Sequence, residues 1–180
     1  MSDTRTFTQA VDAQFTLPEA AMAAANAITR ALAFCAQKMR LSDATAVPGL
    51  LREGDTAAHY YFEYGLAREL GEHIGALDTT VQAVYLYTPD ATPEDVIFGQ
   101  MKPTLVHLVV WVQRKTKALG SLLDCLDRAL AHSYAEIIGV PEQRHMLDAQ
   151  IVDDAEVNSR SGFGAILTWL YNRPLLVWKR

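Results

Sequence analysis

The segment TLVHLVVWVQ, at residues 104–113, decides how this chain is predicted to fold. Successive residues of a strand point to opposite sides of a sheet, and this segment separates its two sides sharply. One side also carries polar and aromatic groups, from His107 and Trp111. The other side is purely aliphatic and consists of Val106, Leu108, Val110 and Val112. The pattern predicts a strand with one face in the core and a mixed face that contacts something else.

Working outward, three further strands are predicted at residues 81–88, 145–153 and 174–179, where β-branched and aromatic residues alternate with others. Apolar residues recur with helical spacing from Leu119 to Ile137, and Gly139 ends this helix. A short helix is expected at residues 162–171. Together these elements predict an α+β or α/β fold with a mixed sheet of about four strands.

Two helices are predicted before the sheet. Thr16 and Glu19 form a capping box, so the first helix begins there, and the second runs from Asp55 or Thr56 to about residue 76. Gly71 and Gly75 lie one turn apart in the second helix, where a close neighbour would explain them. The expected order is therefore two N-terminal helices followed by ββαβαβ, with helices packed on at least one face of the sheet.

The whole chain is expected to form a single domain. Its 180 residues are enough to bury a sizeable core, and no linker or internal repeat divides them. Residues 1–14 lack strong periodicity and are predicted to be a frayed arm or an edge strand.

The charge balance disfavours nucleic acid as a partner. Sixteen basic and 21 acidic residues give a formal charge of −5, whereas binding to phosphates requires clustered Lys and Arg. The only cysteines, Cys35 and Cys125, lie far apart in predicted helices, which is typical of a reducing compartment. No secretion signal or bilayer-spanning run occurs, so a soluble cytoplasmic protein without a membrane partner is expected.

The mixed face of the sheet supplies most of the candidate ligand-binding residues. Tyr85 and Tyr87 share one face of the first strand and could join His107 and Trp111 in an aromatic, partly polar patch. Such patches occur in partner interfaces and in pockets for planar ligands. This face could be a ligand cleft, a dimer interface or a surface half covered by the two N-terminal helices. His107 could accordingly be a ligand contact, a general base or a hydrogen-bonded structural histidine.

Two further candidate sites lie near the C-terminus. Asp148 belongs to an acidic cluster on and after the third predicted strand, whose spacing matches no known cation loop. Ser159, Arg160 and Ser161 precede Gly162 and Gly164 at the start of the last predicted helix, where free amides could hold a phosphate or carboxylate. A serine cap followed by a flexible turn explains the same residues.

The sequence carries no motif for a catalytic or metal centre. Neither His-Glu-x-x-His, Cys-x-x-Cys nor Gly-x-Ser-x-Gly is present, and no cofactor or metal is expected. The preferred hypothesis is therefore a non-catalytic binding domain, a homodimer that uses the mixed sheet face for a partner or small molecule. The alternative is an enzyme that holds a small anionic substrate at the Ser159–Gly164 turn and moves a proton with His107 or Asp148.

Overall fold

A computed structural model describes residues 16–88, 104–169 and 173–180 of the chain. The predicted arm at residues 1–14 lies outside this range. The described elements are α1 (Leu17–Lys38), η1 (Ala44–Ala46), α2 (Val47–Arg52), α3 (Thr56–Leu77), β1 (Val81–Leu86), β2 (Val106–Val112), α5 (Lys117–Ile138), β3 (Leu147–Asp153), α6 (Asp154–Ser159), η2 (Gly162–Thr168) and β4 (Leu175–Lys179). They form one domain of mixed helix and sheet.

The four described strands form one mixed sheet in the order β3-β2-β1-β4. β1 pairs antiparallel with β2 and β4, whereas β2 and β3 are parallel and are joined through α5. A parallel pair requires such a crossover connection, because the chain must return to the same end of the sheet. The α+β class and the mixed sheet of about four strands are thus confirmed.

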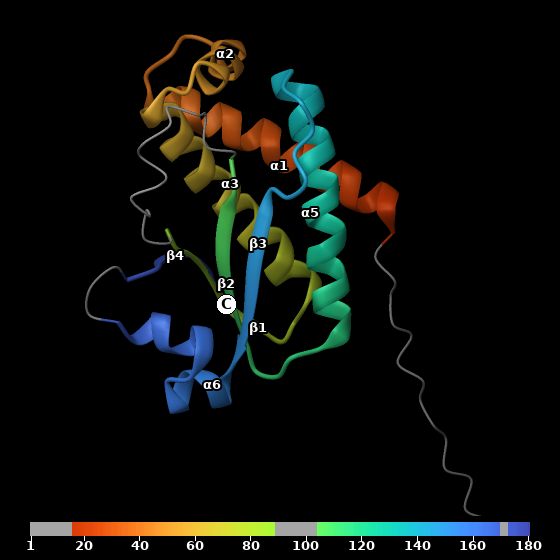
Figure 1. Cartoon of the computed structure of the whole chain (residues 1–180), viewed down its shortest axis with the longest axis vertical. Coiled ribbons are helices and arrows are strands. Elements are labelled where there is room, and N and C mark those ends of the chain that lie inside the picture. The colour runs from red at the N-terminus through yellow and green to blue at the C-terminus, as the bar shows by residue number, and fades with distance from the viewer. Residues whose placement is uncertain (1–15, 89–103, 170–172) are drawn as a thin grey trace, which may run out of the picture.

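Helices cover one face of the sheet in two layers. α3 packs on β1 and β4 and α5 packs on β3, while α1 crosses both helices on the side away from the sheet (Figure 1). The core lies between these layers, and its largest fully buried side chains include Phe62, Leu70, Leu108 and Leu126. The aliphatic side of β2 faces this core, as the alternation at residues 104–113 predicts.

The order of elements is not confirmed, because helices and strands interleave differently from the prediction. The short helix α2 lies between the two N-terminal helices. Pro48 lies in its first turn, where a proline does not interrupt a helix. The helix predicted at 162–171 is the 3-10 segment η2 at Gly162–Thr168, and residues 170–171 lie outside the described range. An additional helix, α6, precedes it, because Asp153 and Glu156 form a capping box that starts α6 directly after β3.

The two glycines of α3 allow close packing, as predicted. A Cβ atom at Gly75 would lie 2.3 Å from the ring of Trp178 on β4, and one at Gly71 would lie 3.0 Å from the Cβ atom of Trp178. Trp178 therefore packs directly on the backbone of α3. A register shift in the pairing of β1 with β4 turns both Trp178 and its neighbour Val177 toward α3, which breaks the simple alternation expected for β4.

The N-terminal helix begins as predicted but buries a partly different stripe. Glu19 accepts a hydrogen bond from the Thr16 amide at 2.9 Å, which completes the expected capping box. The apolar residues of this helix recur at helical spacing from Ala21 through Ile28 and Leu32, which predicts that Ala21 is buried; in the structure it is exposed, and Ala20 and Ala24 are buried instead. No described helix is both long and apolar enough to span a bilayer.

Candidate functional site

Five of the eight predicted site residues share the sheet face opposite α3 and α5, which we call the polar face. The register pairs Tyr85 with Val109 and His107 with Asp148, while the Tyr87 amide donates to the His107 carbonyl at 3.0 Å. Trp111 lies further along β2 on the same side. The structure therefore brings together the following residues: Tyr85, Tyr87, His107, Trp111 and Asp148.

A hydrogen bond between an imidazole and a carboxylate lies at the centre of the polar face. His107 Nδ1 is 3.0 Å from Asp148 Oδ2, and the second oxygen of Asp148 accepts a hydrogen bond from Gln150 Nε2 at 2.7 Å. The ring of Tyr87 lies 5.4 Å from the His107 ring. Burial, together with the charge and hydrogen bonding of Asp148, raises the pKa of Tyr87 above its usual value. Tyr87 thus keeps its proton at neutral pH.

A second carboxylate, Asp154, was not among the predicted site residues. It accepts hydrogen bonds from Trp111 Nε1 at 2.7 Å and from Gln82 Nε2 at 2.8 Å. Asp154 is the first residue of α6, so these bonds fix the start of that helix to β1 and β2. The sequence shows an acidic residue after β3, but only the fold brings it next to the Trp111 indole.

The C-terminal segment, rather than the two N-terminal helices, half covers the polar face. Phe163 of η2 lies with its ring centroid 6.2 Å from that of Tyr87. Gly164 packs on the backbone of Glu156, where a Cβ atom would lie only 2.5 Å away. Under this cover Val109 and Val152 are fully buried. The N-terminal helices belong to the opposite side, so the interpretation in which they cover this face is wrong.

The other three predicted residues are exposed: Ser159 is the last residue of α6, and Arg160 and Ser161 form the turn that leads to η2. Ser159 Oγ donates to the Ala155 carbonyl at 2.7 Å and lies 2.9 Å from Ser161 Oγ. The element that follows is a 3-10 segment of seven residues, so it lacks the aligned peptide dipoles of a long α-helix. This geometry lends no support to the predicted anion site.

The acidic residues around α6 all have structural partners. Asp153 Oδ1 accepts from the Glu156 amide at 3.0 Å, and Glu156 pairs with Lys115 at 2.7 Å. Asp148 and Asp154 bind the side chains described above. Within residues 16–88, 104–169 and 173–180, no group of three or more His, Cys, Asp or Glu side chains is arranged to hold a metal ion. Asp153 and Glu156 therefore cap α6, and Asp154 attaches it to the sheet.

Comparison of the chain with protein-family models, with curated proteins and with solved structures gave no match. Function must therefore be argued from the geometry of the chain itself.

Proposed function

We propose that this protein is a non-catalytic binding domain that forms a homodimer through the polar face. The observation that carries the proposal is a partly exposed apolar strip, which we call the aromatic patch and which consists of the half-buried Tyr85 and Tyr87 and the exposed Phe163 and Leu176. Leu176 pairs with Tyr85 across β4 and β1, and Phe163 contacts Tyr87. Phe163 is 39% exposed and Leu176 is 45% exposed. Contiguous exposed apolar groups of this kind are typical of interfaces.

The polar groups beside the patch favour binding over catalysis. Asp148 and Asp154 are each bonded to two side chains of the same chain, so neither needs a donor from a partner. Such a platform is preorganised, and covering it leaves neither carboxylate without hydrogen-bond donors. The patch itself carries no charged side chain, which allows two acidic copies of the chain to approach there.

The homodimer is tested by light scattering after size-exclusion chromatography. We expect a dimer at micromolar concentration, and a Leu176→Glu variant that is monomeric because a carboxylate would be buried at the two-fold contact. Tyr60→Glu is the matched control, since Tyr60 is 62% exposed on α3, away from the patch. A wild-type monomer, or a Leu176→Glu variant that dimerises as well as wild type, would contradict the proposal.

A second candidate function, an enzyme for a small anionic substrate, is favoured by the His107–Asp148 pair. A carboxylate on Nδ1 orients an imidazole and leaves the other ring nitrogen to move a proton. The anion would have to bind at the Ser159–Gly164 turn beside Arg160. Phosphate titrated into the wild type and an Arg160→Ala variant tests this function by calorimetry. It requires binding that Arg160→Ala abolishes, and the absence of wild-type binding would exclude it.

A cytoplasmic location is part of the proposal. Both cysteines are free thiols, Cys35 fully buried and Cys125 partly so. Free thiols persist in a reducing compartment, which supports this location.

A further inference from the structure

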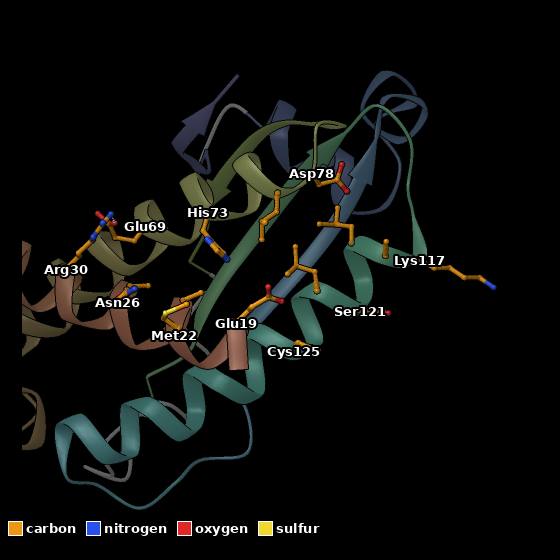
Figure 2. Close-up of a pocket in the computed structure, with 16 residues that line it drawn as sticks. Glu19, Met22, Asn26, Arg30, Glu69, His73, Asp78, Lys117, Ser121 and Cys125 are labelled. Atoms are coloured by element: carbon orange, nitrogen blue, oxygen red, sulfur yellow. Dashed lines mark hydrogen bonds and ion pairs between the residues drawn. The ribbon is translucent and has the colours of Figure 1, made fainter. Parts of the chain in front are cut away.

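An open pocket of about 960 Å³ lies on the other side of the sheet, among α1, α3 and α5 (Figure 2). It exists because α1 crosses the trough between α3 and α5 instead of filling it along its length (Figure 1). Ligand pockets in proteins typically enclose about 300–1,000 Å³. The pocket is therefore large enough for a small organic molecule.

The floor of the pocket is apolar and is kept open by small side chains. Ala23 and Ala27 line it from α1, and Leu119 and Leu122, both buried, line it from α5. At the mouth, Met22 is 64% exposed and so leaves apolar surface in contact with water. A ligand with an apolar chain or ring would remove this surface from water, which contributes about 25 cal/mol for each Å² buried.

The charged groups of the lining differ in how they are compensated. Glu69 is paired with Arg30 at 3.2 Å, so these two charges offset each other. Among the residues that the structure describes, Glu19 is bonded to the neutral Thr16, and its carboxylate points toward the space between α3 and α5 (Figure 2). Lys117 extends away from the pocket in the same view. The mouth of the pocket thus carries an exposed carboxylate, and no ammonium or guanidinium group of residues 16–88, 104–169 or 173–180 forms an ion pair with it.

Two other titratable side chains of the lining, those of His73 and Asp78, add no positive charge to the pocket beside the carboxylate of Glu19. Burial lowers the pKa of His73, so its ring is neutral at pH 7. Hydrogen bonds from Thr16 lower the pKa of Glu19, which keeps that carboxylate ionised. Asp78 adds a carboxylate that accepts hydrogen bonds from Thr80, and the Arg180 guanidinium lies nearby, 3.1 Å from the Asp78 carbonyl oxygen.

We infer that this pocket binds an amphipathic amine, with an ammonium group at Glu19 and an apolar chain or ring against Ala23, Ala27, Leu119 and Leu122. The site lies on the opposite side of the sheet from the aromatic patch. Its occupancy is therefore independent of whether the protein dimerises through the polar face.

Three probes with similar alkyl chains distinguish the contribution of the head group to binding from that of the apolar chain. They are decylamine, decanol and decanoate, each used below its micellar concentration. Calorimetry should show tightest binding for decylamine, at least tenfold tighter than for decanoate. Glu19→Gln should remove most of this preference while decanol still binds, because Gln can replace Glu in a capping box and α1 stays intact. Equal binding of all three probes to the wild type, or no binding of decylamine, would overturn the inference.

A larger side chain inside the pocket tests whether decylamine binds there. Ala23→Leu places a larger side chain into the pocket and should abolish binding of decylamine, whereas Ala33→Leu, at an exposed position on α1, should leave it unchanged. Cys125 provides a readout on the unmutated chain, because it lines the pocket while Cys35 is fully buried. Decylamine should slow alkylation of Cys125 severalfold. Binding that survives Ala23→Leu, or alkylation that decylamine does not slow, would show that the amine binds elsewhere.

Discussion

The two faces of the sheet are built from the same strands but differ in what holds them together. On the helix-covered face, β2 contributes only aliphatic side chains, and all of them are buried against α3, α5 or their neighbours. On the polar face, His107 and Trp111 of the same strand form hydrogen bonds to Asp148 and Asp154. Burial of apolar area is the main stabilising term on the first face, whereas the second combines the burial of Val109 and Val152 with hydrogen bonds of modest net energy.

This difference indicates a division of labour within single strands. The helix-covered face determines the fold, so its positions tolerate little change in volume. In the part of the chain that the structure describes, the short segments α6 and η2 cover the polar face, and Phe163 and Leu176 remain exposed beside it. Adjacent residues of β2 therefore contribute differently to stability and to recognition. Substitutions at adjacent positions can measure how much each face contributes to the free energy of unfolding.

The largest effect is expected at Leu108. Its side chain is fully buried on the helix-covered face, so Leu108→Ala should lower the free energy of unfolding by about 3 kcal/mol, through lost burial and the cavity left behind. His107→Ala, one residue away on the polar face, should cost about 1 kcal/mol. Urea denaturation of both variants measures the difference. Equal losses would show that the two faces contribute alike to the stability of the fold.

Asp127 is an exception that sharpens the comparison, because it is a buried carboxylate of α5 on the helix-covered side. Its Oδ1 atom accepts hydrogen bonds from the amides of Met146 and Leu147, both at 2.8 Å, and its Oδ2 atom bonds to His145. Asp127→Ala leaves the two buried amides without an acceptor and should cost about 2 kcal/mol.

Asp127→Asn is the matched control for that substitution. It keeps one side-chain oxygen for the two amides and should recover at least half of the stability lost in Asp127→Ala, as measured by urea denaturation. An alanine variant as stable as wild type would mean that Asp127 does not anchor the start of β3.

A smaller loss is expected at Gly75, where the helix-covered face is most tightly packed. The new methyl group of Gly75→Ala would lie 2.3 Å from the Trp178 ring, so α3 and β4 must move apart. Overpacking of this kind costs about 1–3 kcal/mol, and the better helix propensity of alanine returns part of it. Thermal unfolding should therefore show a net loss of about 1 kcal/mol.

Gly120 of α5 supplies the control for the glycine substitution. Nothing lies within 4 Å of a Cβ atom placed there, so Gly120→Ala should raise stability by up to about 1 kcal/mol through helix propensity alone. If Gly75→Ala also stabilised the protein, the close contact between α3 and Trp178 would be refuted.

The elements that the sequence predicts correctly are those with a local physical cause. Alternation in residues 104–113 depends only on the geometry of one strand, and the left-handed Gly139 ends α5 as expected. Asp153 and Glu156 have the spacing of a capping box as well, but as part of an acidic cluster after a strand they do not by themselves predict α6. The same type of pattern at Thr16 and Glu19 had predicted α1 correctly.

The arrangement of the candidate site could be predicted only in part. That Tyr85 and Tyr87 share a face follows from the period of a strand, but their place beside His107 depends on the register between β1 and β2. Register depends on pairing between segments far apart in the sequence. The contacts of Asp154 with Trp111 and of Phe163 with Tyr87 required the path of the chain after β3. The pocket among α1, α3 and α5 depends on how α1 crosses two other helices, and no local pattern reveals that crossing.

The smallest effects concern two histidines whose environments shift their pKa values in opposite directions. Burial lowers the pKa of His73 in the pocket, on the helix-covered side of the sheet. For exposed His132 on α5, a hydrogen bond to Glu142, with the charges of Glu136 and Glu142, raises it. NMR titration of the ring protons should place the His73 pKa below the usual 6.5 and the His132 pKa above it.

These shifts make opposite contributions to stability as the pH changes. The unfolded chain binds a proton at His73 more readily than the folded chain, so this residue destabilises the fold as the pH falls below about 6.5. His132 stabilises the fold when the pH is below the pKa that its side chain has in the unfolded chain. This contribution is lost as the pH rises through the higher pKa of the folded state. Glu142→Gln should return the His132 pKa toward 6.5 and leave His73 unchanged. If decylamine occupies the pocket, its addition should shift the His73 resonances and leave those of His107, across the sheet, in place.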